Sequence, residues 1–242
     1  MVSNGNRVRR LVAAGAALIA AIIVPAMSWA DAGVPARCAV PDAYLKFSAD
    51  LDRTEGLLDR KRPVRVLVLG PALSAEGQDR RSLEIALEQK LAGSQFEITE
   101  AMSAGLAEDD FERLRTAVAE TSPDLVIWQV GVRDAMASSD VADFEAVLDQ
   151  ASAWMNARGP DLVLVDPPFV PHVAHERIYT PYVGEIGEVS RTEGVPVIRR
   201  YAAMQYLSMQ DQAKRLPVMS GALPRSPCVT EFMAEAIVRA VR

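Results

Sequence analysis

Short runs of apolar residues alternate along this chain with longer segments in which apolar residues recur every three or four positions. Five runs have the length and composition of buried strands: residues 64–69, 96–99, 125–130, 162–165 and 195–198. Uninterrupted apolar runs are typical of parallel strands, which helices cover on both faces. The pattern predicts one α/β domain with a doubly wound, flavodoxin-like sheet of five parallel strands.

Helical periodicity fills the segments between these runs. Apolar stripes predict helices over residues 83–91, 111–118, 144–155 and 230–241. Asp143 is expected to cap the third of these helices. The spacing of Tyr44, Leu45, Phe47 and Leu51 predicts a further helix across the start of the domain.

The first thirty residues have the features of an export signal. Arg7, Arg9 and Arg10 precede an uncharged, mainly apolar stretch of 17 residues over 11–27, and Ser28-Trp29-Ala30 supplies small residues before a cleavage site. A membrane span needs about 20 apolar residues. We therefore expect residues 1–30 to be a cleaved signal peptide and residues 31–242 to be a periplasmic or secreted domain with no transmembrane span after cleavage. The alternative is a membrane anchor that stays uncut.

Composition narrows the class of protein further. The 242 residues are 50% hydrophobic and 24% charged, which excludes a disordered chain. The formal net charge is −6, and removal of residues 1–30 takes away three arginines and no acid, which leaves −9. Nucleic-acid binding requires a basic face that neutralises phosphates. We therefore expect no nucleic-acid partner.

The two cysteines stand at opposite ends of the expected mature domain. An exported compartment is oxidising enough to join Cys38 to Cys228, and the alternative is two unpaired thiols. Metal binding is not expected, because these cysteines are far apart and His172 and His175 are the chain's two histidines. No cofactor is expected either.

Three stretches resemble the blocks of the SGNH (GDSL-type) hydrolases. Residues 66–75, Val-Leu-Val-Leu-Gly-Pro-Ala-Leu-Ser-Ala, resemble the first block, in which a strand runs into Gly-Asp-Ser-Leu. Residues 124–134, Asp-Leu-Val-Ile-Trp-Gln-Val-Gly-Val-Arg-Asp, resemble the third block, which ends in Gly-x-Asn-Asp, and Ala104-Gly105 stands where the family has its second-block glycine. The resemblance covers most of the chain from Cys38 onward and implies a three-layer α/β/α fold of the exported bacterial branch.

The catalytic residues that this resemblance implies are largely missing. Family members use a serine nucleophile after the first strand, and a histidine base near the last helix with an aspartate three residues before it. The second-block glycine and third-block asparagine complete the oxyanion hole. Here the serine position falls on Ala72 and the asparagine position on Arg133, so that of these positions only Gly105 matches. Residues 216–230 contain neither a histidine nor an acid.

Other polar residues follow the carboxyl ends of the predicted strands, where ligands bind in such sheets. Arg133, Arg199 and Arg200 are candidates for an anion-binding lip, and the alternative is a solvated rim. Asp134 is interpreted as an ion-pair partner or a helix cap rather than a general base.

We therefore expect an exported pseudoenzyme with the hydrolase fold. It has lost ester hydrolysis and binds a ligand, such as a carbohydrate or acylated glycan, at Ala72, Gly105 and Arg133, or it binds an envelope protein partner. The alternative is an active esterase or O-acetyl ester hydrolase that uses Ser74 as a displaced nucleophile and His172 or His175 as its base. A third interpretation is an envelope assembly factor with no small ligand.

Overall fold

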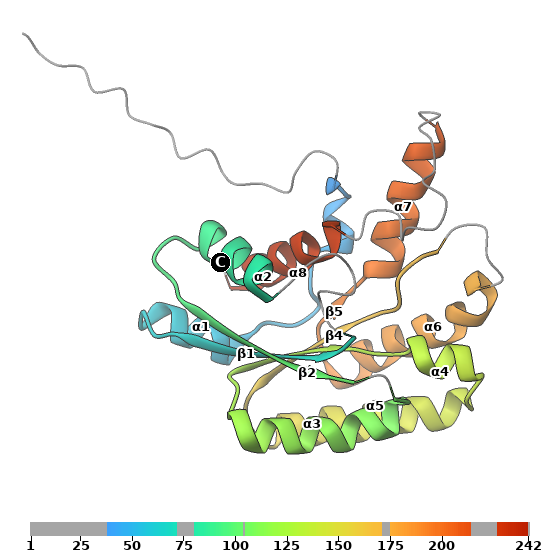
Figure 1. The fold of residues 1–242 in the computed structure, drawn as a ribbon, viewed down its shortest axis with the longest axis horizontal. Coiled ribbons are helices and arrows are strands. Elements are labelled where there is room, and N and C mark those ends of the chain that lie inside the picture. Colours follow the sequence, from blue (N-terminus) through green and yellow to red (C-terminus); the bar gives the residue numbers. More distant parts are fainter. Residues whose placement is uncertain (1–37, 72–79, 104, 171–174, 214–226, 242) are drawn as a thin grey trace, which may run out of the picture. The chain divides into compact units, whose positions relative to one another are not determined.

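One parallel sheet organises the computed structural model, which describes residues 38–71, 80–103, 105–170, 175–213 and 227–241. Figure 1 shows this sheet between its helices, and its strands stand in the order β2-β1-β3-β4-β5. They are β1 (Val64–Gly70), β2 (Phe96–Met102), β3 (Leu125–Gln129), β4 (Asp161–Val165) and β5 (Val197–Ile198). All four pairings are parallel. The predicted doubly wound, flavodoxin-like sheet is confirmed.

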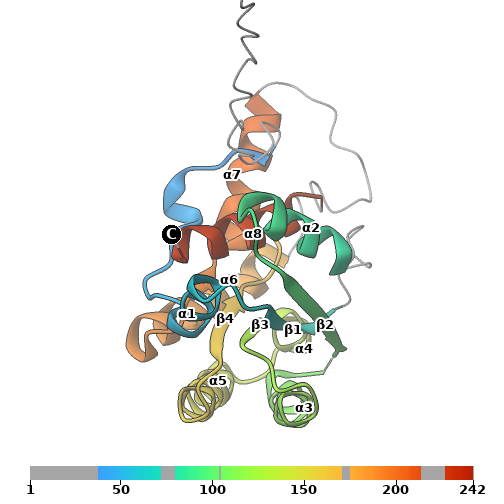
Figure 2. The same ribbon diagram turned by 90° about the vertical axis from the view of Figure 1, so that its left-hand side faces the viewer.

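Helices cover both faces of this sheet (Figure 2). On one face α2 (Arg80–Lys90) packs against α8 (Pro227–Ala240). On the other face α5 (Val141–Asn156) packs against both α3 (Ala107–Thr121) and α6 (His175–Glu193). The remaining helices are α1 (Asp52–Asp59), α4 (Val132–Ala137) and α7 (Arg200–Ala213), and the short 3-10 helix η2 (Asp42–Tyr44) contacts α7. The arrangement has three layers, as the resemblance implied.

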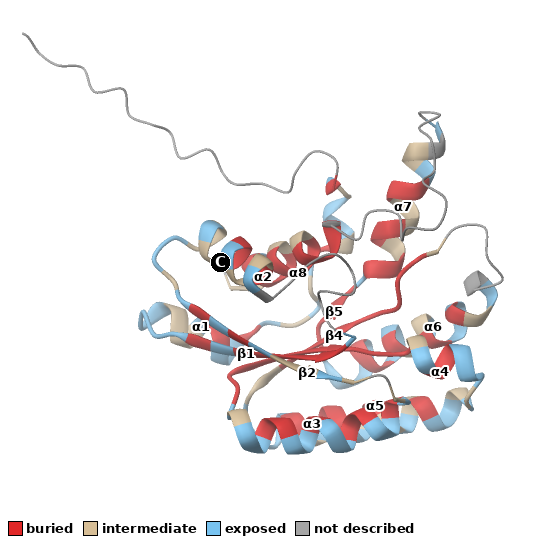
Figure 3. Ribbon diagram, viewed as in Figure 1, coloured by how far each residue is buried: buried red, intermediate tan, exposed pale blue. Residues whose placement is uncertain are grey.

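The core lies between the sheet and the inner faces of these helices (Figure 3). Every residue of β3 is buried, which explains its uninterrupted apolar run. β2 is an edge strand, and it extends three residues beyond the prediction. Its exposed Glu97 and Thr99 alternate with the buried Phe96 and Ile98. An edge strand needs apolar residues on only one face, so a search for continuous apolar runs misses part of it.

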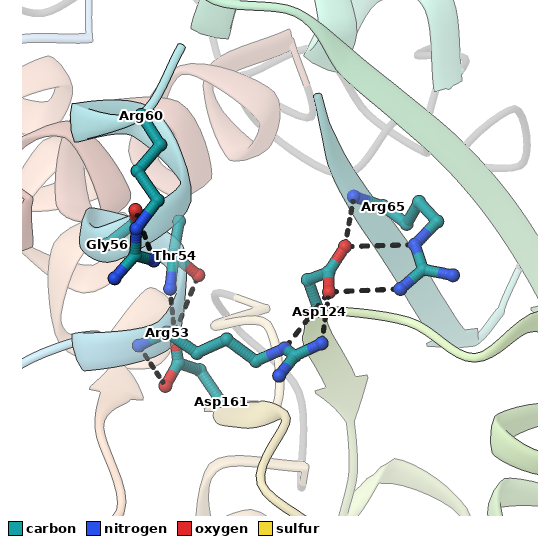
Figure 4. A network of polar contacts seen from close by, with 7 residues as sticks. All are labelled: Arg53, Thr54, Gly56, Arg60, Arg65, Asp124 and Asp161. Carbon is teal, nitrogen blue, oxygen red and sulfur yellow. Dashed lines mark hydrogen bonds and ion pairs between the residues drawn. The ribbon is translucent and has the colours of Figure 1, made fainter. Parts of the chain in front are cut away.

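The segment before α1 is not the helix that the sequence predicts. Only η2 is helical there, and α1 begins at Asp52, after the buried Leu51. The Asp161 carboxylate accepts hydrogen bonds from the backbone N–H groups of Arg53 at 3.3 Å and Thr54 at 2.8 Å, and from the Thr54 hydroxyl at 2.6 Å (Figure 4). This cap comes from a residue 108 positions away. Local spacing therefore could not predict where α1 begins.

The cap of α5 also differs from the prediction. Asp140, not Asp143, is the N-cap residue, and its side chain accepts from the backbone N–H groups of Ala142 and Asp143. A β-region backbone at Asp140 allows its carboxylate to reach these groups, whereas Asp143 already lies in the first helical turn.

A disulfide joins Cys38 to Cys228, with the Cα atoms 5.4 Å apart, so the predicted pairing is confirmed. Both cysteines are buried, and the bond ties the segment before η2 to α8. Among the described helices, none has the length and apolar character needed to cross a membrane.

Candidate functional site

The carboxyl ends of the strands meet at one edge of the sheet, and the candidate site residues follow them in the chain. Ala72 and Ser74 come directly after β1 but lie outside the described residues, as does His172. His175 is the first residue of α6, in the chain segment that follows β4, and its side chain also lies outside the description. The structure describes Gly105 and Arg133 at this edge.

The backbone at the end of β1 is held in place by contacts with β3. Gly70 has φ of +134°, and a Cβ atom at this position would lie 2.8 Å from the Cβ of Gln129. Only glycine accommodates both the backbone angle and the close approach. The Gln129 side-chain amide donates to the Pro71 carbonyl at 3.1 Å. The backbone is thus fixed up to Pro71, and the next residue in the chain is Ala72.

A cluster of buried polar side chains, Gln129, Asp166 and Arg200, lies beside the end of β1. Arg200, which is 1% exposed, donates from Nη1 to Oε1 of Gln129 at 3.1 Å and from Nε to the carbonyl of Asp166 at 2.9 Å. The expectation that Arg200 belongs to a solvent-facing anion-binding lip is wrong. Its guanidinium instead connects the ends of β3 and β4 to the start of α7, while Arg199 is exposed.

Asp166 is the titratable carboxyl group of this cluster. It is buried, and its Oδ1 atom accepts from the backbone N–H of Tyr201 at 2.8 Å, near the start of α7. Burial raises the pKa of Asp166 to about 7, against the opposing effects of the Tyr201 N–H and the Arg200 charge. Two signals for the cluster were present in the sequence: Gln129 is a polar residue inside an apolar run, and Asp166 follows a strand directly.

A second polar cluster surrounds Asp110 on α3, beside the end of β2. The carboxyl group of Asp110 is buried and accepts a hydrogen bond from the Ser103 hydroxyl, and the Gly105 backbone lies close to it. The Trp128 indole N–H approaches the same carboxyl but does not reach hydrogen-bond geometry. Burial raises the pKa of Asp110, and the donors oppose this shift.

Gly105 is closely packed against α3. A Cβ atom at this position would lie 2.8 Å from the Cβ of Asp109 and 3.3 Å from a carboxylate oxygen of Asp110. Any larger residue would therefore displace the start of the helix. The resemblance assigns the Gly105 N–H to an oxyanion hole, and in this structure Gly105 lies beside the Asp110 carboxyl.

Asp134 and Arg133 both lie in α4, yet they have different environments. Asp134 is buried, and its Oδ1 atom accepts from the backbone N–H of Ala107 at 3.0 Å. It therefore caps α3, which confirms the helix-cap interpretation, and burial raises its pKa. Arg133 is exposed in the first turn of α4, after Gly131. An exposed guanidinium at this edge can bind an anionic or hydroxyl-bearing ligand.

Ion pairs connect α1, β1 and the start of β3 at the opposite edge of the sheet. Asp124, before β3, accepts from Arg53 at 2.6 Å and from Arg65 at 3.0 Å (Figure 4). Burial alone would raise the pKa of Asp124, but the hydrogen bonds from the two arginines outweigh it and lower this pKa. Among the described side chains, no three or more His, Cys, Asp or Glu residues are arranged to hold a metal ion.

The three-layer fold, with the block positions following β1, β2 and β3, defines the class: an SGNH/GDSL-type hydrolase fold. A family model described as the Non-GDSL lipase-like family matches residues 37–242, and the chain belongs to this family. The match confirms the resemblance seen in the sequence. It also agrees with the absence of Gly-Asp-Ser-Leu after β1. No curated protein matches the chain.

Solved structures with this fold include several hydrolases. TesA is 21% identical over 72% of this chain and 97% of its own, with a TM-score of 0.55. A lipase/acylhydrolase from Enterococcus faecalis is 23% identical over 73% of this chain and 94% of its own, with a TM-score of 0.56. Axe2, an acetylxylan esterase from Geobacillus stearothermophilus, is 14% identical over 74% of this chain and 94% of its own, with a TM-score of 0.57. At these identities the likeness shows the fold alone.

Proposed function

We propose that this chain is an exported SGNH-fold protein that has lost the ester hydrolysis of its fold relatives and binds a ligand at the carboxyl edge of its sheet. One observation carries the proposal: Ala72 is the second residue after the end of β1, where the resemblance requires the nucleophilic serine. A methyl group cannot attack an ester. Without nucleophile or base, a residual acceleration of about 10³ to 10⁴ over water is the most that binding and an oxyanion hole supply.

The surroundings of Gly105 and Arg133 support this proposal. An oxyanion hole needs donors aimed at the position where negative charge develops. Gly105 matches the second-block glycine and lies against Asp110, whereas Arg133 replaces the asparagine. The third-block oxyanion donor that the resemblance implies is thus altered in kind.

The proposed ligand is a carbohydrate or acylated glycan, bound by Ala72, Gly105 and Arg133. Axe2, which shares the fold, is described as an acetylxylan esterase, and this is consistent with glycan recognition on the scaffold. The Cys38–Cys228 disulfide supports export, because such bonds persist in oxidising compartments. In this proposal residues 1–30 are a cleaved signal peptide, and an envelope protein is the other candidate partner.

Hydrolysis of p-nitrophenyl acetate by the purified mature protein tests the loss of activity. We expect the wild type, Ser74→Ala and a His172→Gln/His175→Gln double variant to give the same rate as buffer. Turnover by the wild type that Ser74→Ala abolishes would overturn the proposal. It would establish the alternative, an active esterase with Ser74 as nucleophile, and the double variant would then report on its base.

Titration with acetylated xylo-oligosaccharides tests the binding half of the proposal. Arg133→Ala should weaken binding by about tenfold or more, because a charge-assisted hydrogen bond is lost. Arg62→Ala, which removes an exposed arginine before β1, should leave the affinity unchanged. Equal affinities of the wild type and Arg133→Ala would remove Arg133 from the site. If the wild type does not bind the glycan, the ligand assignment is wrong, and cross-linking tests the envelope partner instead.

A further inference from the structure

A pocket of about 340 Å³ lies on the outer side of α3 and α5, the two helices seen end-on below the sheet in Figure 2. Its lining includes Arg115, Thr116, Val118, Ala119, Trp154 and Arg158. Trp154 lies near the end of α5 and Arg158 just after it, before β4 begins. The pocket is therefore separate from the carboxyl edge of the sheet, where the proposed function places its ligand. Its volume is at the lower end of the range for small-molecule sites, about 300 to 1,000 Å³.

Aromatic rings and guanidinium groups meet in this pocket. Trp154 is half-buried and lies edge to face with Phe111, with ring centres 6.0 Å apart. The guanidinium carbon of Arg158 lies 3.7 Å from the centre of the Trp154 ring, and that of Arg115 lies 6.0 Å from the centre of Phe111. A guanidinium stacked on an indole keeps N–H groups at its rim, where they can still bind a carboxylate side-on.

The charge of the pocket differs from that of the whole protein. Its lining contains two arginines and one glutamate, whereas the chain has a net charge of −6. Arg115 pairs with Glu112 at 2.9 Å. No carboxylate in the described ranges pairs with Arg158, whose Nη1 donates a hydrogen bond to the Trp154 carbonyl at 3.4 Å and leaves its other N–H groups for a ligand. The pocket therefore offers an exposed cation beside an aromatic surface to an anionic ligand.

We propose that this pocket binds an acidic sugar, such as a uronate residue of a polysaccharide. The carboxylate of the sugar binds the N–H groups of Arg158, and the C–H face of its ring packs against the edge of Trp154 and against Val118. Sugar hydroxyls reach the Thr116 hydroxyl and the Glu112 carboxylate. The inference does not depend on the function proposed for the carboxyl edge.

Trigalacturonate is the probe, and binding is followed by isothermal titration and by tryptophan fluorescence. In the mature protein the fluorescence comes from Trp128, which is buried, and Trp154. Arg158→Gln should weaken binding by about tenfold or more, as expected for loss of a charge-assisted contact. Arg62→Gln, which changes an exposed arginine outside the pocket, should bind like the wild type. Trp154→Phe, which keeps an aromatic ring beside Phe111, should abolish the fluorescence change.

Three results would each overturn this inference. The first is the absence of saturable trigalacturonate binding up to about 10 mM, a concentration well above the dissociation constants of useful sites. The others are the same affinity in Arg158→Gln and the wild type, and equally tight binding of the neutral maltotriose. Competition by sulfate at equal concentration would show a nonspecific charge effect and would also count against a sugar site. None of these results bears on ester hydrolysis, and Arg158 is not part of the carboxyl edge, so the two proposals fail separately.

Discussion

Asp166 is a buried titratable residue at the carboxyl edge. Its folded-state pKa of about 7 lies above the ordinary aspartate value of 3.8, because the group is buried. Between these values the native state binds more protons than the unfolded chain. The free energy of unfolding therefore decreases as the pH rises from about 4 to about 7, and stability is greatest on the acidic side of this range.

This linkage gives a measurable prediction. Urea unfolding of the mature protein should show a loss on the order of 1 to 4 kcal/mol between about pH 5 and about pH 8. Asp166→Asn, which resembles the protonated form, should flatten this dependence without abolishing it, because burial also raises the pKa of Asp110 and Asp134. Asp143→Asn, which changes an exposed carboxylate, should behave like the wild type. A slope for Asp166→Asn that matches the wild type would show that another group is responsible.

The site residues that the sequence could indicate are those in short blocks beside predicted strands. The blocks predict Ala72, Gly105 and Arg133 in this way, because each block is contiguous in the chain. The hydrogen bond from Arg200 to Gln129 joins residues 71 positions apart, and no local pattern encodes it. Arg200 was therefore placed in a solvent-facing lip, although its side chain is buried.

At the scale of the secondary-structure elements, central strands were predicted better than peripheral ones. β3 is buried throughout, so its apolar run defined it to within one residue. The edge strand β2 was predicted less well, because polar residues alternate with apolar ones along it. The segment before α1 was also predicted less well, because contacts with residues far away in the chain determine where the helix begins. Asp161 illustrates the second case, since its carboxylate at the start of β4 caps α1.

Removal of this long-range cap should destabilise the attachment of α1 to the sheet. Asp161→Ala deletes acceptors for two backbone N–H groups and the Thr54 hydroxyl, and caps are worth about 0.5 to 2 kcal/mol. We expect a loss of about that size in the free energy of urea unfolding. Asp52→Ala removes an exposed acidic residue from the first turn of the same helix and should cost less. Equal losses in the two variants would contradict the capping role.

Across the whole molecule, the two edges of the sheet are built differently. Salt bridges from Arg53 and Arg65 to Asp124 connect the elements at the amino edge beside β3, and Arg65 is partly exposed there. At the carboxyl edge, buried groups of Asp110, Asp166 and Arg200 hydrogen-bond within the chain, while Arg133 is exposed. A shared fold alone therefore does not determine catalysis.

The disulfide also affects the stability of the whole molecule, because Cys38 and Cys228 are 190 residues apart and the segment between them contains the entire sheet. Cross-linking so long a loop restricts the unfolded chain and contributes on the order of 5 kcal/mol at most, with smaller measured values common. The Cys38→Ser/Cys228→Ser double variant should therefore unfold at a lower Tm than the oxidised wild type. Reduction of the wild type with a strong thiol should bring its Tm down to that of the variant, while the variant should not respond. A wild-type Tm that is insensitive to complete reduction would show that the bond adds nothing to stability.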